Sequence, residues 1–412
     1  MSPAVLVRLA WRSLWRHRRR TFITVASIAL GLTLVLFAKQ LNEGAYRQMV
    51  DDAVRMQAGH VTVEHADYRD APAIDLTVRI ADDLRARIES LEEVERTKLL
   101  VSGQGVARTG RGAVGVALMG IEPGVVRDAS PFAKHIVDGE YLAPDDGRDV
   151  VLGRALAERL HLAVGKKLVL SSNDAHGNLV EELFRVRGIF ELGADEIDGY
   201  FVEAPIDALR GLYGLADDEA TQLGVLLHDP DDVSAVRDTV AGMLPDGRAV
   251  VLPWREVLPD LAGAIQLDRV SDGVVLGLLL ALTLFTIFNT LFMSVLERQR
   301  EMTVQLALGT PPSALRLQVF LESVLVGALG CGFGTVLGGL WSYRVQQVGL
   351  DLSGVMEDGA TMSGFAMDPV IHAHVSAATM AEIVGPLYVA ILLLGLVPMR
   401  RIGKLDLAST LR

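Results

Sequence analysis

Four runs of uncharged, mostly apolar residues interrupt an otherwise mixed pattern of polar and apolar positions. The longest, residues 274–296, has 23 uncharged positions and exceeds the roughly 30 Å hydrocarbon layer at about 1.5 Å per helical residue. Three shorter runs reach spanning length when flanking residues are included. The predicted transmembrane helices cover residues 21–41, 272–296, 317–341 and 379–397. The first run is too long for a signal-peptide core, and no small-residue cleavage site follows it, so it is interpreted as a retained anchor.

Residues 42–268 have no such run and show shorter patterns instead. Residues 60–64 and 184–190 are typical of strands, whereas 82–91 and 233–243 repeat apolar residues at helical spacing. The fold class predicted is therefore an α-helical membrane protein with four transmembrane helices plus a large α+β extracytoplasmic domain inserted between the first two. The first helix is expected to continue outward as far as about residue 56.

Charge divides the chain into the same two regions. The formal net charge is −12, but residues 45–265 alone contain 23 Lys and Arg against 39 Asp and Glu, and the remainder carries a small positive excess. This distribution argues against nucleic acid as a partner and against a soluble enzyme of two similar domains. The single cysteine, Cys331, excludes an intrachain disulfide.

Basic residues in the short flanks orient the spans. Six arginines lie in the amphipathic segment 1–20, and more lie in the connection 297–313 and the tail 398–412, whereas the loop 342–378 has one arginine against four acidic residues. The positive-inside rule therefore places both termini and the connection in the cytoplasm, and the 42–268 domain and the loop outside.

Two histidine pairs and one acidic run suggest metal ligands only weakly. His60 and His65 flank one predicted strand, and His372 and His374 alternate along another segment, but no third ligand follows at a suitable spacing. The acidic run 195–198 lacks the ligand alternation of a calcium loop and is interpreted as a solvated turn. No phosphate-binding loop, nucleophile elbow or zinc-protease motif occurs. The chain is therefore predicted to bind no metal or cofactor and to hydrolyse no ATP by itself.

The connection at 297–313 is predicted to form a short amphipathic helix. Met302, Val304 and Leu308 can share one face while charged residues occupy the other, and Gly309 with the prolines after it ends the helix. From the residues alone this helix is either a docking element or an interfacial connector whose charges set the topology.

This region carries a resemblance to a known family. The residues Asn289, Glu297-Arg298-Gln299-Arg300-Glu301, Ala307-Leu308-Gly309 and Leu321-Glu322 resemble the signature of FtsX-like ABC transporter permeases of the MacB-like superfamily. Similarity to the lipoprotein-release (LolC/LolE) branch extends to residues 10–21, 59–63, 351–354, 368–371 and 405–412. Met302-Thr303 and Leu407 depart from that pattern, which usually has Ile-Gly and Pro.

The resemblance implies a non-catalytic subunit of a dimer that pairs with an identical or diverged second permease subunit. A separate ATPase subunit would bind ATP and Mg²⁺, and its motion would be transmitted to the periplasmic domain of this inner-membrane protein. The implied substrate is a lipoprotein, which a periplasmic chaperone would receive. A MacB-like exporter of peptides or drugs and an FtsX-like regulator of a cell-wall hydrolase are the alternatives.

The family also implies roles for particular residues. The coupling helix would contact the ATPase through Arg298, Arg300, Glu301, Gln305, Leu308 and Gly309, although Glu301 could instead only pair with Arg298 inside the helix. The acyl-chain cavity would be lined by Leu34, Phe37, Leu41, Leu278, Leu282 and Phe285, unless these face lipid or the core. Helix packing is assigned to Asn289, Gly330, Gly334 and Gly338, because small residues four apart let helices approach and a buried amide needs a partner.

Overall fold

The computed structural model describes residues 3–16, 18–57, 59–244, 247–352, 361–362, 365–366 and 370–402. The chain divides into two compact units. The membrane unit comprises Met1–Ala45, Leu267–Asp351 and Val370–Arg412, and the α+β unit comprises Tyr46–Gln266 and Leu352–Pro369. The family-like positions 353–354, 368–369 and 405–412, Leu407 among them, lie outside the described residues.

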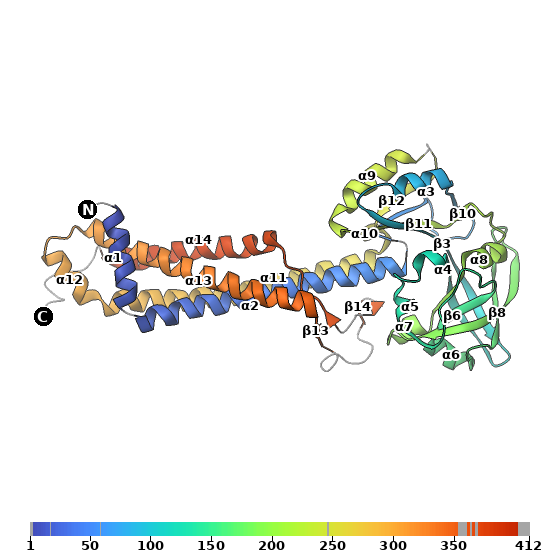
Figure 1. Cartoon of the computed structure of the whole chain (residues 1–412), viewed down its shortest axis with the longest axis horizontal. Helices are drawn as coiled ribbons and strands as arrows, with labels where there is room; N and C mark the ends of the chain where they lie inside the picture. The colour runs from blue at the N-terminus through green and yellow to red at the C-terminus, as the bar shows by residue number, and fades with distance from the viewer. Residues whose placement is uncertain are drawn as a thin grey trace. The chain divides into compact units, whose positions relative to one another are not determined.

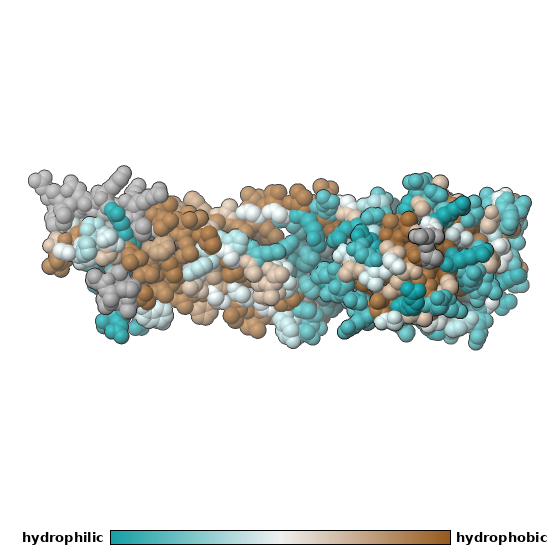
Figure 2. All heavy atoms as spheres, turned by 90° about the horizontal axis from the view of Figure 1, so that it is seen from above, coloured by the Kyte–Doolittle hydropathy of each residue, from teal (hydrophilic) through white to brown (hydrophobic). Residues whose placement is uncertain are grey.

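Within the described residues, four helices are long and apolar enough to cross a membrane (Figure 1). They are α2 (Arg18–Met56), α11 (Pro259–Glu297), α13 (Pro312–Val348) and α14 (Ala377–Ile402). Each contains one of the predicted spans, and the predicted continuation of the first helix as far as residue 56 is confirmed. Figure 2 shows hydrophobic residues covering much of the surface of the membrane unit, which is the pattern of a surface that faces lipid or partner helices.

The membrane unit is held together by apolar side chains from several helices. Leu14 of α1 (Pro3–Arg16), Ile28 and Leu32 of α2, Ile287 of α11 and Ile391 of α14 belong to one buried cluster. The unit also contains the short helix α12 (Gln299–Ala307) and a two-stranded pair, β13 (Leu350–Asp351) with β16 (Val370–Ile371).

The α+β unit is built on one large sheet. Its strands are β1 (Val61–His65), β3 (Val94–Thr109), β4 (Gly112–Ile121), β5 (Ile136–Gly139), β6 (Asp149–Gly153), β7 (Lys167–Asn173), β8 (Leu179–Phe190), β9 (Phe201–Pro205), β11 (Gln222–Leu227) and β12 (Ala249–Pro253). The order is β12-β1-β11-β3-β4-β9-β6-β8-β5, and β7 pairs with both β3 and β8. Strands β3, β4, β9, β6, β8 and β7 therefore close into a ring, while β12, β1 and β11 extend β3 as an open sheet.

Helices and two short strand pairs complete this unit. The helices are α3 (Asp82–Glu89), α4 (Pro123–Val126), α5 (Pro131–Lys134), α6 (Arg154–Leu160), α7 (Asp195–Asp198), α8 (Ile206–Tyr213), η1 (Pro230–Asp232), α9 (Val233–Met243) and α10 (Trp254–Val257). The strand pairs are β2 (Val78–Arg79) with β10 (Glu219–Ala220) and β14 (Thr361–Met362) with β15 (Phe365–Ala366). Leu84, Leu118, Phe184 and Val240 lie in the main core, which spans both parts of the sheet. The predicted fold class is confirmed.

One glycine is required where α2 leads into β1. Gly59 has φ 95°, and a Cβ there would lie 2.7 Å from the backbone nitrogen of Val225 on β11. Because a side chain at that φ is strained and would also strike backbone, only glycine fits this turn.

Candidate coupling site in the membrane unit

Helix α12 is a short, separately capped segment between two long helices. It begins after Arg298 and ends at Ala307, and Gly309, just beyond its end, has a φ of 91°, a conformation that glycine adopts at little cost. Pro312 then occupies the first turn of α13, where a missing N–H is harmless. The predicted short helix is present, and its ends follow the glycine and proline signals.

A buried ion pair anchors the start of α12 to α13. The Arg298 Nη1 donates a hydrogen bond of 2.7 Å to Oε2 of Glu322, and both side chains are about nine-tenths buried. The Arg298 Nε also lies 3.4 Å from Oε2 of Glu301. Arg298 is therefore an internal anchor, and its predicted role as a surface contact for the ATPase is corrected. The intrahelical pair with Glu301 does form.

Two weaker ion pairs join the N-terminal helices α1 and α2 to α12 and to the end of α11. The Arg16 Nη2 lies 3.6 Å from Glu301 Oε1, and the Arg20 Nη1 lies 3.8 Å from Glu297 Oε2. Because Arg16 and Glu297 are largely exposed, these pairs contribute little to stability individually. Together with the buried pair, they connect α1, α2, α11, α12 and α13 at one end of the membrane unit.

The inner face of α12 is apolar and packs on α13. Met302 is 2% exposed and forms a small cluster with Leu315, Val319 and the half-buried Leu306. The predicted face that combined Met302 with Val304 and Leu308 is wrong, because Val304 is 48% exposed and Leu308 81% exposed. The departure from the family pattern at Met302-Thr303 thus lies on the internal face of the helix.

The outer face of α12 presents a basic residue followed by two apolar ones. Arg300, Val304 and Leu308 are spaced four residues apart and all are exposed. We call these three residues the docking face. Gln305 is half-buried beside them and Gly309 is exposed at the end. Exposed apolar residues next to a single charge are typical of protein contact surfaces, so this face is the candidate ATPase contact.

The structure places the predicted glycine stripe of α13 against α2. A Cβ on Gly330 would lie 2.6 Å from side-chain atoms of Ile28, and one on Gly334 would lie 2.9 Å from the carbonyl oxygen of Ala29. A Cβ on Gly338 would meet Leu36 at 3.2 Å. This close approach is the geometry that small residues permit between membrane helices.

Asn289 is not part of that contact. Its side chain is exposed on α11 and makes no hydrogen bond to another described residue. The described residues therefore give no interhelical partner for this amide, and its predicted role in helix packing stays a prediction.

The six predicted cavity residues lie on different surfaces of the described membrane unit. Phe37 stacks on Trp341 of α13, with ring centroids 4.3 Å apart, whereas Leu34 is exposed and Leu41 is half-buried. The three residues on α11 are more than 60% exposed and follow one another along the helix; they are Leu278, Leu282 and Phe285. The α11 row remains available to a lipid chain or a partner, while Phe37 is already occupied by an intrachain contact.

In the α+β unit, charged groups that the sequence analysis did not single out hold the end of α2. The buried Lys98 donates hydrogen bonds from Nζ to the carbonyl oxygens of Arg55, at 2.7 Å, and of Val54, at 3.3 Å. Arg55 itself pairs with Asp51 and Glu95, each at 2.8 Å. Lys98 stands on β3 between the buried residues Thr97 and Leu99, and a charge at a buried position of a strand was the signal available.

Burial shifts the pKa of Lys98 and of the buried Glu203. It lowers the pKa of Lys98 to about 7 and raises the pKa of Glu203 to about 7, each partly offset by the charge of the other residue. The Tyr141 hydroxyl donates a 2.8 Å hydrogen bond to Glu203. Burial also raises the pKa of that hydroxyl.

The histidine and acidic candidates have structural partners. His60 is fully buried, accepts a hydrogen bond at Nδ1 from the Leu227 N–H, and has its pKa lowered to about 4 by burial. Among the described residues, no cluster of three His, Cys, Asp or Glu is arranged to hold a metal. The interpretation of 195–198 as solvated holds for Asp195 and Glu196, which are exposed, but is wrong for Asp198, which is buried and accepts hydrogen bonds from the N–H groups of Leu192 and Gly193.

Comparison with known families assigns the two regions of the chain. The MacB-like periplasmic core domain matches residues 21–243, and the FtsX-like permease C-terminal domain matches residues 273–407. The transmembrane protein LolC of the lipoprotein-releasing system of Neisseria meningitidis is 24% identical, over 80% of this chain and 78% of that protein. The corresponding LolE of Haemophilus influenzae is 21% identical, over 76% and 74%.

Similarity also extends to exporters. The macrolide export ATP-binding/permease protein MacB of Nitrosomonas europaea is 23% identical over 81% of this chain but only 50% of that protein. The crystallised periplasmic region of MacB from Actinobacillus actinomycetemcomitans is 13% identical and covers 50% of this chain at a TM-score of 0.36, too slight a likeness to support a conclusion.

Proposed function

Because the chain belongs to the family of FtsX-like permeases with a MacB-like periplasmic core domain, we propose that it extracts lipid-anchored proteins from a membrane. The family makes it an ABC transporter permease, a multi-pass membrane protein with a periplasmic-type domain. Domains of this kind are typical of non-catalytic subunits that work with an ATPase. In the proposal a separate ATPase subunit binds ATP and Mg²⁺, a second permease subunit completes the transporter, and a periplasmic chaperone accepts the lipoprotein.

The docking face of α12 is the observation that carries the proposal. Arg300, Val304 and Leu308 present an open surface, and the buried pair of Arg298 with Glu322 fixes the helix to α13 from below. A displacement of the docking face by the ATPase would therefore move α13 as well. α13 in turn packs on α2 through the glycine stripe, so the same motion reaches the helix that leads into the α+β unit.

The open row on α11 supports an acyl-chain substrate. Leu278, Leu282 and Phe285 are each more than 60% exposed in the part of the chain that the structure describes, and a lipid anchor needs apolar surface of this kind to leave the bilayer. The two relatives named above as parts of a lipoprotein-releasing system match this chain over 78% and 74% of their length. Export of a peptide or drug is the second candidate, favoured by the MacB relative.

Reconstitution tests the proposal directly. The permease, its partner ATPase subunit and a tagged lipoprotein are placed in vesicles, and lipoprotein in the soluble fraction is measured with ATP and a soluble acceptor. We expect ATP-dependent release, and expect Leu308→Asp to abolish both release and stimulation of the ATPase. Leu179→Asp, at an equally exposed leucine of the α+β unit, is the control for ATPase stimulation.

The outcomes separate the candidates. A complex whose ATPase is stimulated but which releases no lipoprotein, and which instead accumulates a peptide or drug across the vesicle membrane, is an exporter. Stimulation that survives Leu308→Asp would remove the docking face from the proposal.

A further inference from the structure

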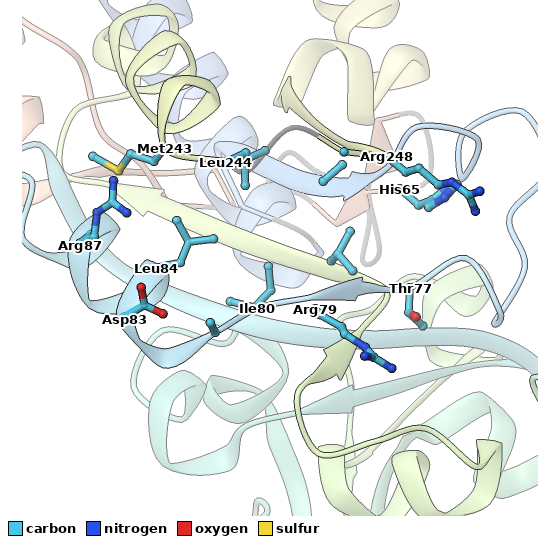
Figure 3. A pocket seen from close by; sticks show the side chains of 14 residues that line it. His65, Thr77, Arg79, Ile80, Asp83, Leu84, Arg87, Met243, Leu244 and Arg248 are labelled. Carbon is cyan, nitrogen blue, oxygen red and sulfur yellow. The ribbon is translucent and has the colours of Figure 1, made fainter.

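The α+β unit contains a surface pocket that none of the roles above uses. Its volume is about 450 Å³, and it lies between α3 with β2 on one side and the end of α9 with the start of β12 on the other (Figure 3). Ile80, Leu84, Met243 and Leu244 give it an apolar lining. A volume of this size is within the range of pockets that bind small molecules or a few side chains of a partner.

Positive charge lies at both ends of this apolar lining. Figure 3 shows Arg87 at one end and Arg248 with His65 at the other, with Leu84 between them. Arg248 and His65 are neighbours through the backbone, because the N–H of Ala66 donates to the Arg248 carbonyl at 2.7 Å. Neither Arg87 nor Arg248 forms an ion pair with any described residue. Both guanidinium groups can therefore accept an anionic ligand.

The other polar groups of the pocket include one acidic residue and one further hydrogen-bond donor. Arg79 is already paired with Glu219 at 3.1 Å, and Asp83 is the single acidic residue of the lining. His65 accepts a hydrogen bond at Nδ1 from the Asp67 N–H, so the neutral ring carries its proton on Nε2. That nitrogen is a further donor at the Arg248 end.

The charge is opposite to that of its surroundings. Residues 45–265 have 39 acidic against 23 basic residues, yet the lining has three arginines against one aspartate. The excess of acidic residues in this unit repels an acidic partner, whereas the three arginines of the pocket attract one, and such a local difference in charge favours binding at the pocket.

We propose that this pocket binds an acidic segment of a partner protein, with carboxylates on both sides of apolar side chains. The apolar side chains would cover Leu84 and Leu244, and the carboxylates would pair with Arg87 at one end and Arg248 at the other. This is a docking contact for a protein in the compartment of the α+β unit. It does not depend on which substrate the transporter moves.

A capped, fluorescently labelled hexapeptide with two glutamates on each side of two leucines is a suitable probe. Its binding to the full chain in neutral-lipid nanodiscs is measured by fluorescence anisotropy. We expect saturable binding that weakens about fivefold in Arg87→Gln and in Arg248→Gln, and about twenty-five-fold in the double variant, because exposed ion pairs contribute up to about 1 kcal/mol each. Raising the salt concentration should weaken binding as well.

Matched controls make the result decisive. Arg111→Gln removes an exposed arginine outside the pocket and should bind the probe normally. A peptide with glutamines in place of the glutamates, and one with glycines in place of the leucines, should each bind at least tenfold more weakly. Absence of saturable binding, or equal binding to the double variant, would overturn the proposal. Lipoprotein release could stand in either case, since its assay needs no peptide.

Discussion

The two units of this protein differ in how many of their apolar residues are exposed. The α+β unit encloses most of its apolar residues in two buried clusters, and the face shown in Figure 2 is largely polar. In the membrane unit, only 6% of the most apolar stretch of α11 is buried inside the described structure, whereas 44% of the corresponding stretch of α13 is buried. Leu267, Val274, Leu278, Leu282 and Phe285 are all more than 60% exposed along α11.

The difference shows which unit is complete by itself. The α+β unit needs no further surface to satisfy its core, and its buried charges have partners within it, as with Lys98 and Arg55. The membrane unit buries α13 against its neighbours and leaves α11 to be covered by lipid or by another subunit. Function at the membrane is therefore expected to depend on what covers α11 and on what touches α12.

The largest expected effect is loss of the buried ion pair in the membrane unit. Arg298→Ala leaves the Glu322 carboxylate buried without its partner, which costs about 3–5 kcal/mol. Cys331 is the only cysteine and is 5% exposed, so its rate of alkylation on heating reports unfolding of this unit. We expect a strongly lowered midpoint for Arg298→Ala.

Two variants sharpen that result. Arg298→Met combined with Glu322→Leu removes both charges and should recover most of the lost stability, whereas Arg300→Ala, on the exposed face, should change little. If Arg298→Ala is as stable as Arg300→Ala, the anchor role of Arg298 is wrong.

The α+β unit should respond to pH through His60. Its folded pKa of about 4 lies below the usual 6.5, so the unfolded chain binds the proton first as pH falls. The contribution of His60 to the free energy of unfolding is fully present above pH 6.5. It is lost as the pH falls from 6.5 to 4, by about 3 kcal/mol at most. Hydrogen exchange of amides in residues 46–266 should accelerate over that range.

His60→Asn is the comparison, because its side-chain oxygen can still accept from the Leu227 N–H but does not titrate. We expect this variant to lose the pH-dependent part of the change. Equal pH dependence in the two proteins would assign the effect to other groups.

The glycine stripe should show a smaller, position-specific effect. A Cβ at Gly334 would lie 2.9 Å from the Ala29 carbonyl oxygen, so Gly334→Ala must separate α13 from α2 and should cost about 1–3 kcal/mol. Gly332, two residues away, has open space around its Cβ position, and Gly332→Ala should be neutral or slightly stabilising. Cys331 alkylation measures both, and equal midpoints would mean that the stripe does not set the helix spacing.

The smallest expected effect on stability is on the docking face. Leu308 is 81% exposed, so Leu308→Asp should change the free energy of unfolding by no more than about 0.5 kcal/mol while removing stimulation of the ATPase. A large loss of stability would show that the residue belongs to the core of the unit after all.

Much of the architecture could be predicted from the sequence because long apolar runs and charge asymmetry act over whole segments. The spans, the inserted α+β domain and the glycine stripe follow from residues 274–296 or Gly330, Gly334 and Gly338 without knowledge of packing. The orientation of α12 does not, since a nine-residue helix with apolar residues at 302, 304 and 306, followed directly by Leu308, admits two buried faces. Contact with Leu315 and Val319 selects the one that contains Met302.

Side-chain roles in the site were predictable only where one residue type has one physical use. Glycine stripes serve close packing, but an arginine in a coupling motif can face a partner or an internal carboxylate. Arg298 takes the second role because Glu322, 24 positions later, comes within 2.7 Å of it. Asp198 shows the same limitation. It accepts hydrogen bonds from the N–H groups of Leu192 and Gly193, and these depend on a turn that no sequence motif predicts.

Photocrosslinking from the two faces of α12 tests the coupling site most directly. A photoreactive residue is placed at position 308 or at position 302 of the full chain, in membranes that contain the ATPase. The account predicts an ATPase crosslink from 308 and an intrachain crosslink to α13 from 302. An ATPase crosslink from 302, or none from 308, would contradict it.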